Sequence, residues 1–417
     1  MTSTKHHLPI ISGLAIVAMV GLSACNATAT AGTTAGRTDS TGAAGSSASA
    51  APTQTATPTK TTPNVKWMTT PDAASSDVPV DTRVTATTED GTLTDAALSY
   101  VSKKGNTVDA PGWLESGTWT ATDLLQPGVT YTLDLTAKDA DGRTTEIKRT
   151  FQTVNLTLDD QIYVKVTPGD GQTVGVGMPV IVTFDLPVVD KANFQKHMTV
   201  QTTPKQEGSW YWLSSREAHW RPKAYWQPGT KVHVDANLNG VPAGGNRYGE
   251  QSRTSDFTIG RSVIAKVDLK TDQMNVYVSG KNVKTIPVSG GRPGWETRSG
   301  VKVIMAKFTN FTMKAESIGL KEGDKDYYHD VTVKRALQLT HSGEFLHSAP
   351  WSVSQQGKTN VSHGCTGVSN ANSDWIYENM IIGDIVETTG SNKPMKMGNG
   401  YADWSLSWAN YQKGSAL

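Results

Sequence analysis

Residues 131–137 read Tyr131-Thr132-Leu133-Asp134-Leu135-Thr136-Ala137, so apolar and polar side chains alternate along the whole stretch. Successive side chains of a β-strand point to opposite faces of its sheet, and this alternation therefore predicts a strand with one buried face. Asp141-Gly142 supplies a hairpin turn, and residues 147–151 continue as a second strand. Similar short stretches surround this hairpin, which predicts an all-β sandwich over residues 65–154.

Residues 155–260 repeat the order of features found in this first unit. Gln126-Pro127-Gly128 precedes one strand, and Gln227-Pro228-Gly229 precedes another. In both units a turn rich in Gly or Asp follows, and then a closing strand that contains Phe151 or Phe257. The matching order predicts two related sandwiches.

The second unit is rich in aromatic residues and contains three histidines. For the aromatic group we favour a role in core or interdomain packing, and the alternative is a carbohydrate-binding face. The histidines are isolated from other chemistry-bearing residues, and we interpret them as structural or surface residues. The two sets are Trp210, Tyr211, Trp212, Trp220 and Trp226, and His197, His219 and His233.

A third unit, residues 261–390, also reads mainly as strands. A helix is predicted at 370–380, and the remaining residues, 391–417, form a tail with Trp404, Trp408 and Tyr411. Because a tail this aromatic has apolar surface to bury, we expect it to pack on the third unit. The predicted strands are 263–269, 273–278, 283–288, 301–308, 343–348 and 384–389.

The N-terminal segment predicts export and membrane attachment. Residues 1–25 contain an apolar run that is short for a bilayer span and ends in Leu22-Ser23-Ala24-Cys25, which matches a bacterial lipobox. We expect lipidation of Cys25 and a location at the outer face of the cytoplasmic membrane, in the cell wall space. The alternative is an ordinary secretory signal cleaved near Ala24. Residues 26–64 consist mainly of Ala, Thr, Ser, Gly and Pro and predict a disordered tether.

Charge excludes one class of partner. The chain of 417 residues has a formal net charge of +1 and no block of like charge. Binding to nucleic acid depends on clustered Lys and Arg, so no nucleic-acid partner is expected.

The second cysteine of the chain lies in a setting typical of a nucleophile. Cys365 follows Ser362-His363-Gly364, and His347-Ser348 lies upstream on a separate predicted strand. A thiol is mostly protonated at neutral pH, so a catalytic cysteine needs a base or a positive neighbour to form its thiolate. His363 is too near in sequence to be the obvious base, whereas His347 can approach the sulfur from another element. Gly364 allows a tight turn, and the backbone N–H groups around it are natural oxyanion donors.

These motifs resemble a known family. His347-Ser348-Ala349-Pro350-Trp351-Ser352 followed by Ser362-His363-Gly364-Cys365 resembles the signature of the L,D-transpeptidases with a YkuD-type catalytic domain. The lipobox, the tether and the two sandwiches are similar to the arrangement in actinobacterial members. The resemblance implies a mainly β chain, with two immunoglobulin-like sandwiches before a β-sandwich-type catalytic domain that carries a short helix and the aromatic tail.

The resemblance also implies an activity. Such enzymes attack the bond before the terminal D-alanine of a tetrapeptide stem of peptidoglycan, form a cysteine thioester and make 3→3 cross-links. Peptidoglycan stem peptides are then the partners, carbapenem-type β-lactams the expected covalent inhibitors, and neither a metal nor an organic cofactor is involved.

Carried over to this chain, the family's roles fall on ten residues. Cys365 is the nucleophile and His347 its base, Ser348 supports the imidazole through its carbonyl, His363 orients the loop, and Gly364 and Cys365 supply oxyanion N–H groups. The expected substrate-binding residues are Met313, Tyr328, Trp351, Asn360 and Ser362.

One departure keeps other interpretations open. Family members usually carry Asn or Arg two residues beyond the cysteine, where this chain has Gly367. Without that side chain the enzyme could be a weakened, wall-binding lipoprotein, and the same site with water as acceptor would be an L,D-carboxypeptidase. Two further alternatives are a buried structural cysteine and a zinc site formed by His347, His363 and Cys365.

Overall fold

The computed structural model describes residues 63–417, and these are mainly β-strand. The predicted signal segment, the lipobox with Cys25 and almost the whole predicted tether lie outside the described residues. None of the helices in the described range has the length and apolar character that a membrane crossing needs.

The first sandwich contains the predicted hairpin. Strands β7 and β8 pair antiparallel with Tyr131 opposite Phe151, whose rings stack at 5.2 Å. The alternating residues Leu133 and Leu135 point into the core, as the period of two predicts. The two sheets, in strand order, are β1 (Lys66–Thr70), β2 (Thr85–Glu89), β6 (Thr118–Ala121), β5 (Gly112–Glu115), and β4 (Thr107–Ala110), β3 (Gly91–Val101), β7 (Thr130–Asp139), β8 (Thr144–Gln152).

The second sandwich repeats the local geometry of the first. The N–H of Gly128 donates to the carbonyl of Val154, and the N–H of Gly229 donates to that of Ile259, each at 2.9 Å. Both glycines have a positive φ, 68° and 81°, which a side chain would disfavour. The shared Gln-Pro-Gly therefore marks equivalent turns, one before β7 in the first sandwich and one before β16 (Lys231–Ala236) in the second.

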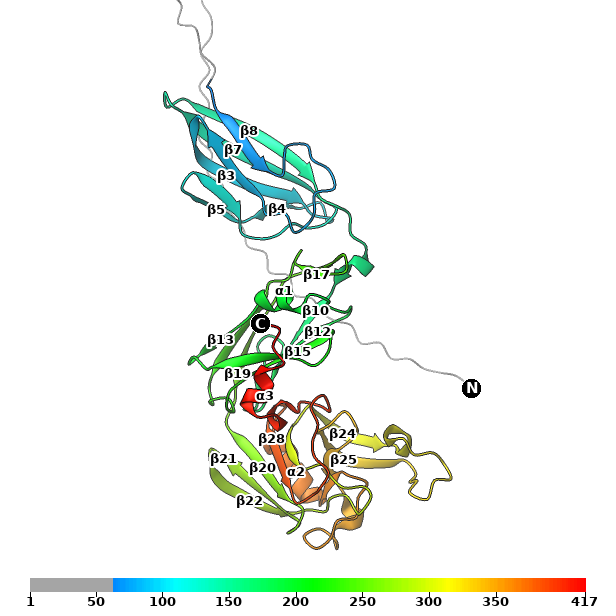
Figure 1. The fold of residues 1–417 in the computed structure, drawn as a ribbon. Helices are drawn as coiled ribbons and strands as arrows, with labels where there is room; N and C mark the ends of the chain where they lie inside the picture. Colours follow the sequence, from blue (N-terminus) through cyan, green and yellow to red (C-terminus); the bar gives the residue numbers. More distant parts are fainter. Residues whose placement is uncertain (1–62) are drawn as a thin grey trace, which may run out of the picture. The chain divides into compact units, whose positions relative to one another are not determined.

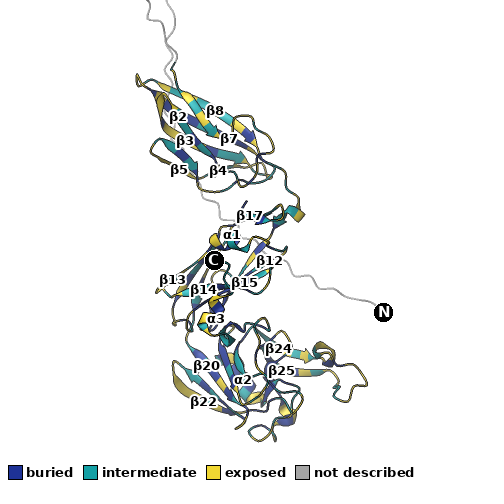
Figure 2. Ribbon diagram, viewed as in Figure 1, coloured by how far each residue is buried: buried dark blue, intermediate teal, exposed yellow. Residues whose placement is uncertain are grey.

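The strands of the second sandwich lie in two larger sheets and one small sheet. At its centre, β12 and β15 are buried along most of their length (Figure 2). The sheets are β10 (Val164–Thr167), β12 (Val180–Phe184), β15 (Glu217–Pro222), β14 (Gly208–Trp212); β11 (Thr173–Val174), β19 (Arg253–Ile259), β16 (Lys231–Ala236), β13 (Met198–Thr203); and β17 (Pro242–Gly244), β18 (Arg247–Gly249), β9 (Gln161–Ile162).

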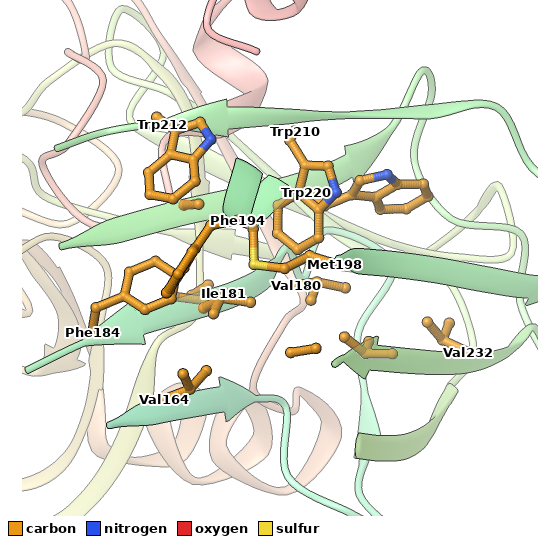
Figure 3. Packing of buried hydrophobic residues seen from close by; sticks show 14 of the residues in the cluster. Val164, Val180, Ile181, Phe184, Phe194, Met198, Trp210, Trp212, Trp220 and Val232 are labelled. Carbon is orange, nitrogen blue, oxygen red and sulfur yellow. The ribbon is translucent and has the colours of Figure 1, made fainter. Parts of the chain in front are cut away.

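The tryptophans of this sandwich form its core. Trp210, Trp212, Trp220 and Trp226 are all buried, and Figure 3 shows the first three gathered with Phe184 and other apolar side chains. The rings of Phe184 and Trp212 stack at 5.5 Å. Burial of these indole rings confirms the packing role and leaves them no face for a carbohydrate.

The third unit contains a five-stranded and a four-stranded sheet (Figure 1). The helix α2 packs against the four-stranded sheet, and its Ile376 is part of the buried core. The sheets are β22 (Lys281–Pro287), β21 (Gln273–Val278), β20 (Val263–Asp268), β28 (Ile385–Thr389), β23 (Gly300–Val303), and β24 (Ala306–Met313), β25 (Val331–Gln338), β26 (Phe345–Ser348), β27 (Thr366–Val368). The helices of the described chain are α1 (Lys191–Lys196), α2 (Asn370–Asn379) and α3 (Trp408–Gln412), with short 3₁₀ turns η1 (Leu158–Asp160), η2 (Ala315–Ile318), η3 (Pro350–Ser352) and η4 (Asp403–Ser405).

One predicted strand of the third unit is wrong. Residues 301–308 form two strands in different sheets, β23 and β24, with Ile304 and Met305 between them. Val303 and Ile304 are both fully buried, so the alternation is broken where the chain passes from one sheet to the other.

The C-terminal tail packs on the third unit only in part. Its first part contacts the third unit, because Met395 pairs its N–H with the carbonyl of Ser299. The helix α3, with Trp408 and Tyr411, instead neighbours β14 of the second sandwich (Figure 2), whereas η4, with Trp404, also contacts β23 of the third unit. The guanidinium of buried Arg221, on β15, faces the three rings of Trp404, Trp408 and Tyr411 at 4.5, 5.4 and 4.3 Å.

His219 has a structural role that its sequence context does not indicate. It is 1% exposed, and its Nδ1 lies 2.9 Å from a carboxylate oxygen of Asp403 in the tail, while Nε2 lies 2.8 Å from Glu217. Burial favours the neutral ring, but Asp403 and Glu217 outweigh it and raise the pKa of His219 to about 9. His219 is therefore a buried cation that ties the tail to the second sandwich.

This ion pair predicts a pH-dependent stability. The pKa of His219 is raised on folding, so its contribution is fully present below about pH 6.5 and is lost as the pH rises through about 9. His219→Gln should cost about 3 kcal/mol of unfolding free energy near pH 6 and little near pH 9.5. Urea denaturation of both proteins at the two pH values measures this difference.

The matched control for this measurement is His233→Gln. His233 pairs with Asp256 at 2.9 Å on the surface, where 40% and 69% of the two side chains are exposed, so its loss should matter little at either pH. A cost for His219→Gln that is the same at both pH values would contradict the assignment.

Candidate active site

The sulfur of Cys365 lies against the backbone that leads into β26. The N–H of Phe345 donates to Sγ at 3.4 Å, and the thiol donates to the carbonyl of Gly343 at 3.5 Å. Cys365 directly precedes β27, which pairs parallel with β26. The sheet therefore holds the loop that ends in Cys365 beside the strand that carries His347.

His347 is oriented by its own strand. Its Nδ1 lies 2.9 Å from the carbonyl oxygen of Ser348, so the neutral ring donates from Nδ1 and keeps a lone pair on Nε2. Ser348 itself is fully buried, and its hydroxyl accepts the N–H of Arg335 from β25 at 3.3 Å. His347 and Cys365 line the same cavity of about 240 Å³. The geometry suits a thiol and a general base.

Both groups are neutral at rest. Burial raises the pKa of Cys365 to about 12, against the N–H of Phe345, which lowers it; the charge of Glu344 raises it further and that of Lys302 lowers it. Burial also lowers the pKa of His347 to about 4, although the carbonyl of Ser348 opposes this shift. The resting thiol is therefore protonated and is not a thiolate, since a buried ion pair is not stabilised here.

The loop before Cys365 is closed by its own hydrogen bonds. The hydroxyl of Ser362 donates to the carbonyl of Cys365 at 2.6 Å and accepts the N–H of Gly364 at 3.1 Å. The N–H of Gly364 is predicted above to be an oxyanion donor, but it already donates to the hydroxyl of Ser362. The N–H of Cys365 makes no hydrogen bond within residues 63–417, and it is the donor that an oxyanion can reach.

His363 anchors this loop to a cluster that the sequence did not reveal. Its Nε2 lies 2.9 Å from Nη2 of Arg292 and 2.9 Å from the carbonyl of Asp326. Arg292 and Asp326 form an ion pair at 2.7 Å, and the indole of Trp295 donates to Asp326 at 3.2 Å. Burial and the guanidinium lower the pKa of His363. Nε2 thus lies between a donor, the guanidinium of Arg292, and an acceptor, the carbonyl of Asp326, and the nearby cation would repel a metal ion.

A second cavity is also lined by Cys365. It measures about 280 Å³, and Cys365, His363, Tyr328 and Met313 line both cavities. Burial raises the pKa of Tyr328 to about 12, so its hydroxyl is a donor at neutral pH. Trp351 and Ser362 line the first cavity, and the indole is 57% exposed at its rim. Four of the five predicted substrate-binding residues thus surround the sulfur.

Asn360 is the exception and corrects the prediction. Its amide oxygen accepts the N–H of Gly290, and its amide nitrogen donates to the carbonyl of Leu269 at 2.9 Å. It lines a different cavity, beside Glu296 and Lys393, rather than either cavity at Cys365. Asn360 therefore braces the base of the loop.

Gly367 lies at a position where an added side chain would come close to Ala349. Its backbone pairs with Ser289 in both directions, at 2.8 and 3.0 Å, and a Cβ added here would lie 3.0 Å from the Cβ of Ala349. The small residue thus fits this packing.

Within residues 63–417 there is no group of three or more His, Cys, Asp or Glu side chains that could hold a metal ion.

Comparison with known proteins places this site in a family. Residues 262–388 match the L,D-transpeptidase catalytic domain (YkuD), and residues 75–242 match a bacterial Ig domain. L,D-transpeptidase 2 of Mycobacterium tuberculosis (strain CDC 1551) is 38% identical over 342 residues, which cover 81% of this chain and 82% of that protein. The chain belongs to the L,D-transpeptidase family.

Other family members show the same relationship over shorter ranges. L,D-transpeptidase 5 of Mycobacterium tuberculosis (strain H37Rv) is 34% identical over 72% of this chain and 66% of its own length. The solved structure of the LD transpeptidase LdtMt1 in complex with imipenem is 33% identical, with a TM-score of 0.48, and covers 54% of this chain and 97% of that one.

The neutral thiol of this L,D-transpeptidase predicts slow alkylation. Because the thiolate is the reactive form and burial disfavours it, iodoacetamide should modify folded Cys365 at least about tenfold more slowly than the urea-denatured chain near pH 7.5. Mass spectrometry of the peptide that contains Cys365 measures both rates. Equal rates in the two states would show that the thiol is neither buried nor raised in pKa.

Proposed function

We propose that this L,D-transpeptidase forms 3→3 cross-links between peptidoglycan stem peptides through a thioester on Cys365. The observation that carries the proposal is the shared cavity of Cys365 and His347, with the imidazole oriented by the carbonyl of Ser348. Family membership supports peptidoglycan as the substrate. The donor is a tetrapeptide stem.

In the first step the thiol attacks the carbonyl carbon of the amide bond before the terminal D-alanine. Nε2 of His347 takes the thiol proton as the C–S bond forms, and the N–H of Cys365 donates to the oxyanion. The tetrahedral intermediate collapses when His347 passes its proton to the departing amine of D-alanine. The thioester stays on Cys365, and the imidazole returns to its neutral form.

In the second step an amine from the side chain of the third residue of another stem attacks the thioester. His347 takes the proton of this amine and returns it to the sulfur as the C–S bond breaks, which restores the thiol. The two cavities that meet at Cys365 favour transfer over hydrolysis, since each gives one peptide its own approach to the sulfur. Donor and acceptor can then be bound at the same time.

The thiol and its cavity also explain why β-lactams are expected inhibitors. A carbapenem ring carries a strained amide carbonyl, and attack by Sγ opens the ring and leaves the inhibitor bound as a thioester. The family member LdtMt1 has been solved in complex with imipenem. The same reaction at Cys365 is therefore part of the proposal.

Carbapenem binding is the direct test. Intact-mass spectrometry after incubation with imipenem should show one adduct, which is absent in Cys365→Ala and forms at least about a hundredfold more slowly in His347→Ala. Cys25→Ala is the matched control, and its adduct should form at the wild-type rate. A folded wild-type protein without an adduct would contradict the proposed nucleophile.

Product analysis separates transfer from hydrolysis. Purified tetrapeptide stems incubated with the enzyme should yield cross-linked dimers and free D-alanine, because two peptides can approach the sulfur. Chromatography with mass spectrometry identifies both products. Tripeptides without dimers would instead identify an L,D-carboxypeptidase.

We further propose that Cys25 is lipidated and holds the enzyme at the outer face of the cytoplasmic membrane. The support is the match of Leu22-Ser23-Ala24-Cys25 to a lipobox after an apolar run. In cells that express the full chain, Cys25→Ala should move the enzyme from the membrane fraction to the soluble fraction. Immunoblotting of the fractions measures this, and a variant that stays in the membrane fraction would contradict lipid anchoring.

A further inference from the structure

A buried ion cluster lies behind the nucleophile and has no part in the steps above. Lys302 on β23 has no exposed surface, and it is the one buried lysine among residues 63–417. Its Nζ lies 2.8 Å from Oε2 of Glu344. Oε1 of Glu344 accepts from Arg298 twice, from the backbone N–H at 3.1 Å and from Nη1 at 2.7 Å. A lysine is rarely buried to this extent without a partner.

Glu344 stands between the two residues that hold the sulfur. The carbonyl of Gly343 accepts from the thiol, and the N–H of Phe345 donates to Sγ. Anchoring the side chain of Glu344 on two sides thus fixes the backbone groups before and after it. The carboxylate is also close to the loop of the nucleophile, since a Cβ on Gly364 would lie 4.0 Å from Oε1.

The cluster combines opposite charges. Burial lowers the pKa of Lys302, and the carboxylate of Glu344 opposes this shift. At the sulfur, Glu344 disfavours the thiolate and Lys302 favours it. The other titratable groups that line the cavities at Cys365 come from different elements, and they are His347, His363, His341, Tyr328 and Lys314. His347 and Tyr328 are neutral at pH 7, because burial lowers the pKa of the first and raises that of the second.

We propose that Arg298, Glu344 and Lys302 form a positioning cluster for Cys365. Glu344, held by Arg298, fixes the backbone groups of Gly343 and Phe345 on the sulfur, and the ammonium of Lys302 stabilises the negative charge that develops on Sγ during attack. The inference rests on the proposed role of Cys365 as nucleophile. Buried ion pairs contribute little to stability relative to apolar residues, which makes a role in orientation and charge the better explanation for this one.

The charge part of the proposal is tested with Lys302→Met. The variant leaves Glu344 paired with Arg298 but removes the positive charge of Lys302, which favours the thiolate. Alkylation of Cys365 by iodoacetamide near pH 8 should slow about tenfold, and the pH at which thiolate absorbance appears should rise. Lys302→Met/Glu344→Gln removes both charges, which act on Sγ in opposite directions, and should return the rate to within about twofold of wild type.

The positional part is tested with Lys302→Met/Glu344→Ala. This variant has the same charge as Lys302→Met/Glu344→Gln, but it lacks the side-chain oxygen that accepts from Arg298. It should be alkylated about fivefold more slowly than its Gln counterpart, which corresponds to one lost hydrogen bond to the sulfur. Lys307→Met is the control for removing a partly buried lysine, since its Nζ bonds the carbonyls of Tyr377 and Met380 on α2 and after it.

The outcomes are distinct from those that test the function. An unchanged rate and absorbance in Lys302→Met, or a Lys302→Met/Glu344→Gln variant as slow as Lys302→Met, would overturn the role of charge. Equal rates for the Gln and Ala double variants would overturn the role in position. Because alkylation requires a reactive thiol but no transpeptidation, a wild-type enzyme without an imipenem adduct would defeat the proposed function and leave these rates interpretable.

Discussion

The parallel pairing of β26 with β27 is the constraint on which the active site depends. It sets His347 opposite Gly367, two residues after Cys365, and brings the backbone of Gly343 and Phe345 to the sulfur. Parallel strands cannot be joined by a tight turn, so the connection must be long. The residues between the two strands use that length to build the cavity wall with Trp351 and the loop that Ser362 closes. The register of the two strands thus brings Cys365 and His347, the proposed nucleophile and base, to the same cavity.

Burial of this pair has a chemical consequence. Desolvation moves the two pKa values apart, to about 12 for Cys365 and about 4 for His347, so the resting site holds no ion pair. With a pKa of about 4, the imidazole of His347 stays neutral, and so able to accept a proton, at neutral pH. The thiol is also less easily oxidised, because oxidation proceeds through the thiolate and little thiolate is present. The cost is a weak nucleophile at rest. Fixed dipoles and the charge of Lys302 offset that cost at the moment of attack, without reorganisation.

Local patterns in the sequence predicted what depends on local structure. The alternation at 131–137 and the repeated Gln-Pro-Gly gave strands and turns that the structure confirms, because side-chain period and glycine φ values are set within a few residues. The prediction of a single strand at 301–308 was wrong because the three successive apolar residues Val303 to Met305 fit either sheet. Tertiary packing, which the local pattern does not contain, determines where one strand ends and the next begins. His219 and Asp403 are 184 residues apart, so no spacing could reveal their pairing. Asn360 was misplaced for a related reason, since its position in the motif does not say which cavity it faces.

The second sandwich packs directly against the catalytic unit. Ile385 of β28 is buried in the core of that sandwich, although its strand lies between β20 and β23 in the catalytic unit. The N–H groups of Gly175 and Gly177 donate to the carbonyls of Ile382 and Gly383 at 2.8 Å, and a Cβ on Gly175 would lie 2.2 Å from the backbone of Asp384. Only backbone without side chains fits so close an approach. β23 also carries Lys302, so the strand pair that borders the sandwich is the one that supports the charge behind Cys365. A change at this interface would therefore affect the surroundings of Cys365 through the neighbouring strands β28 and β23, and not through the cavity.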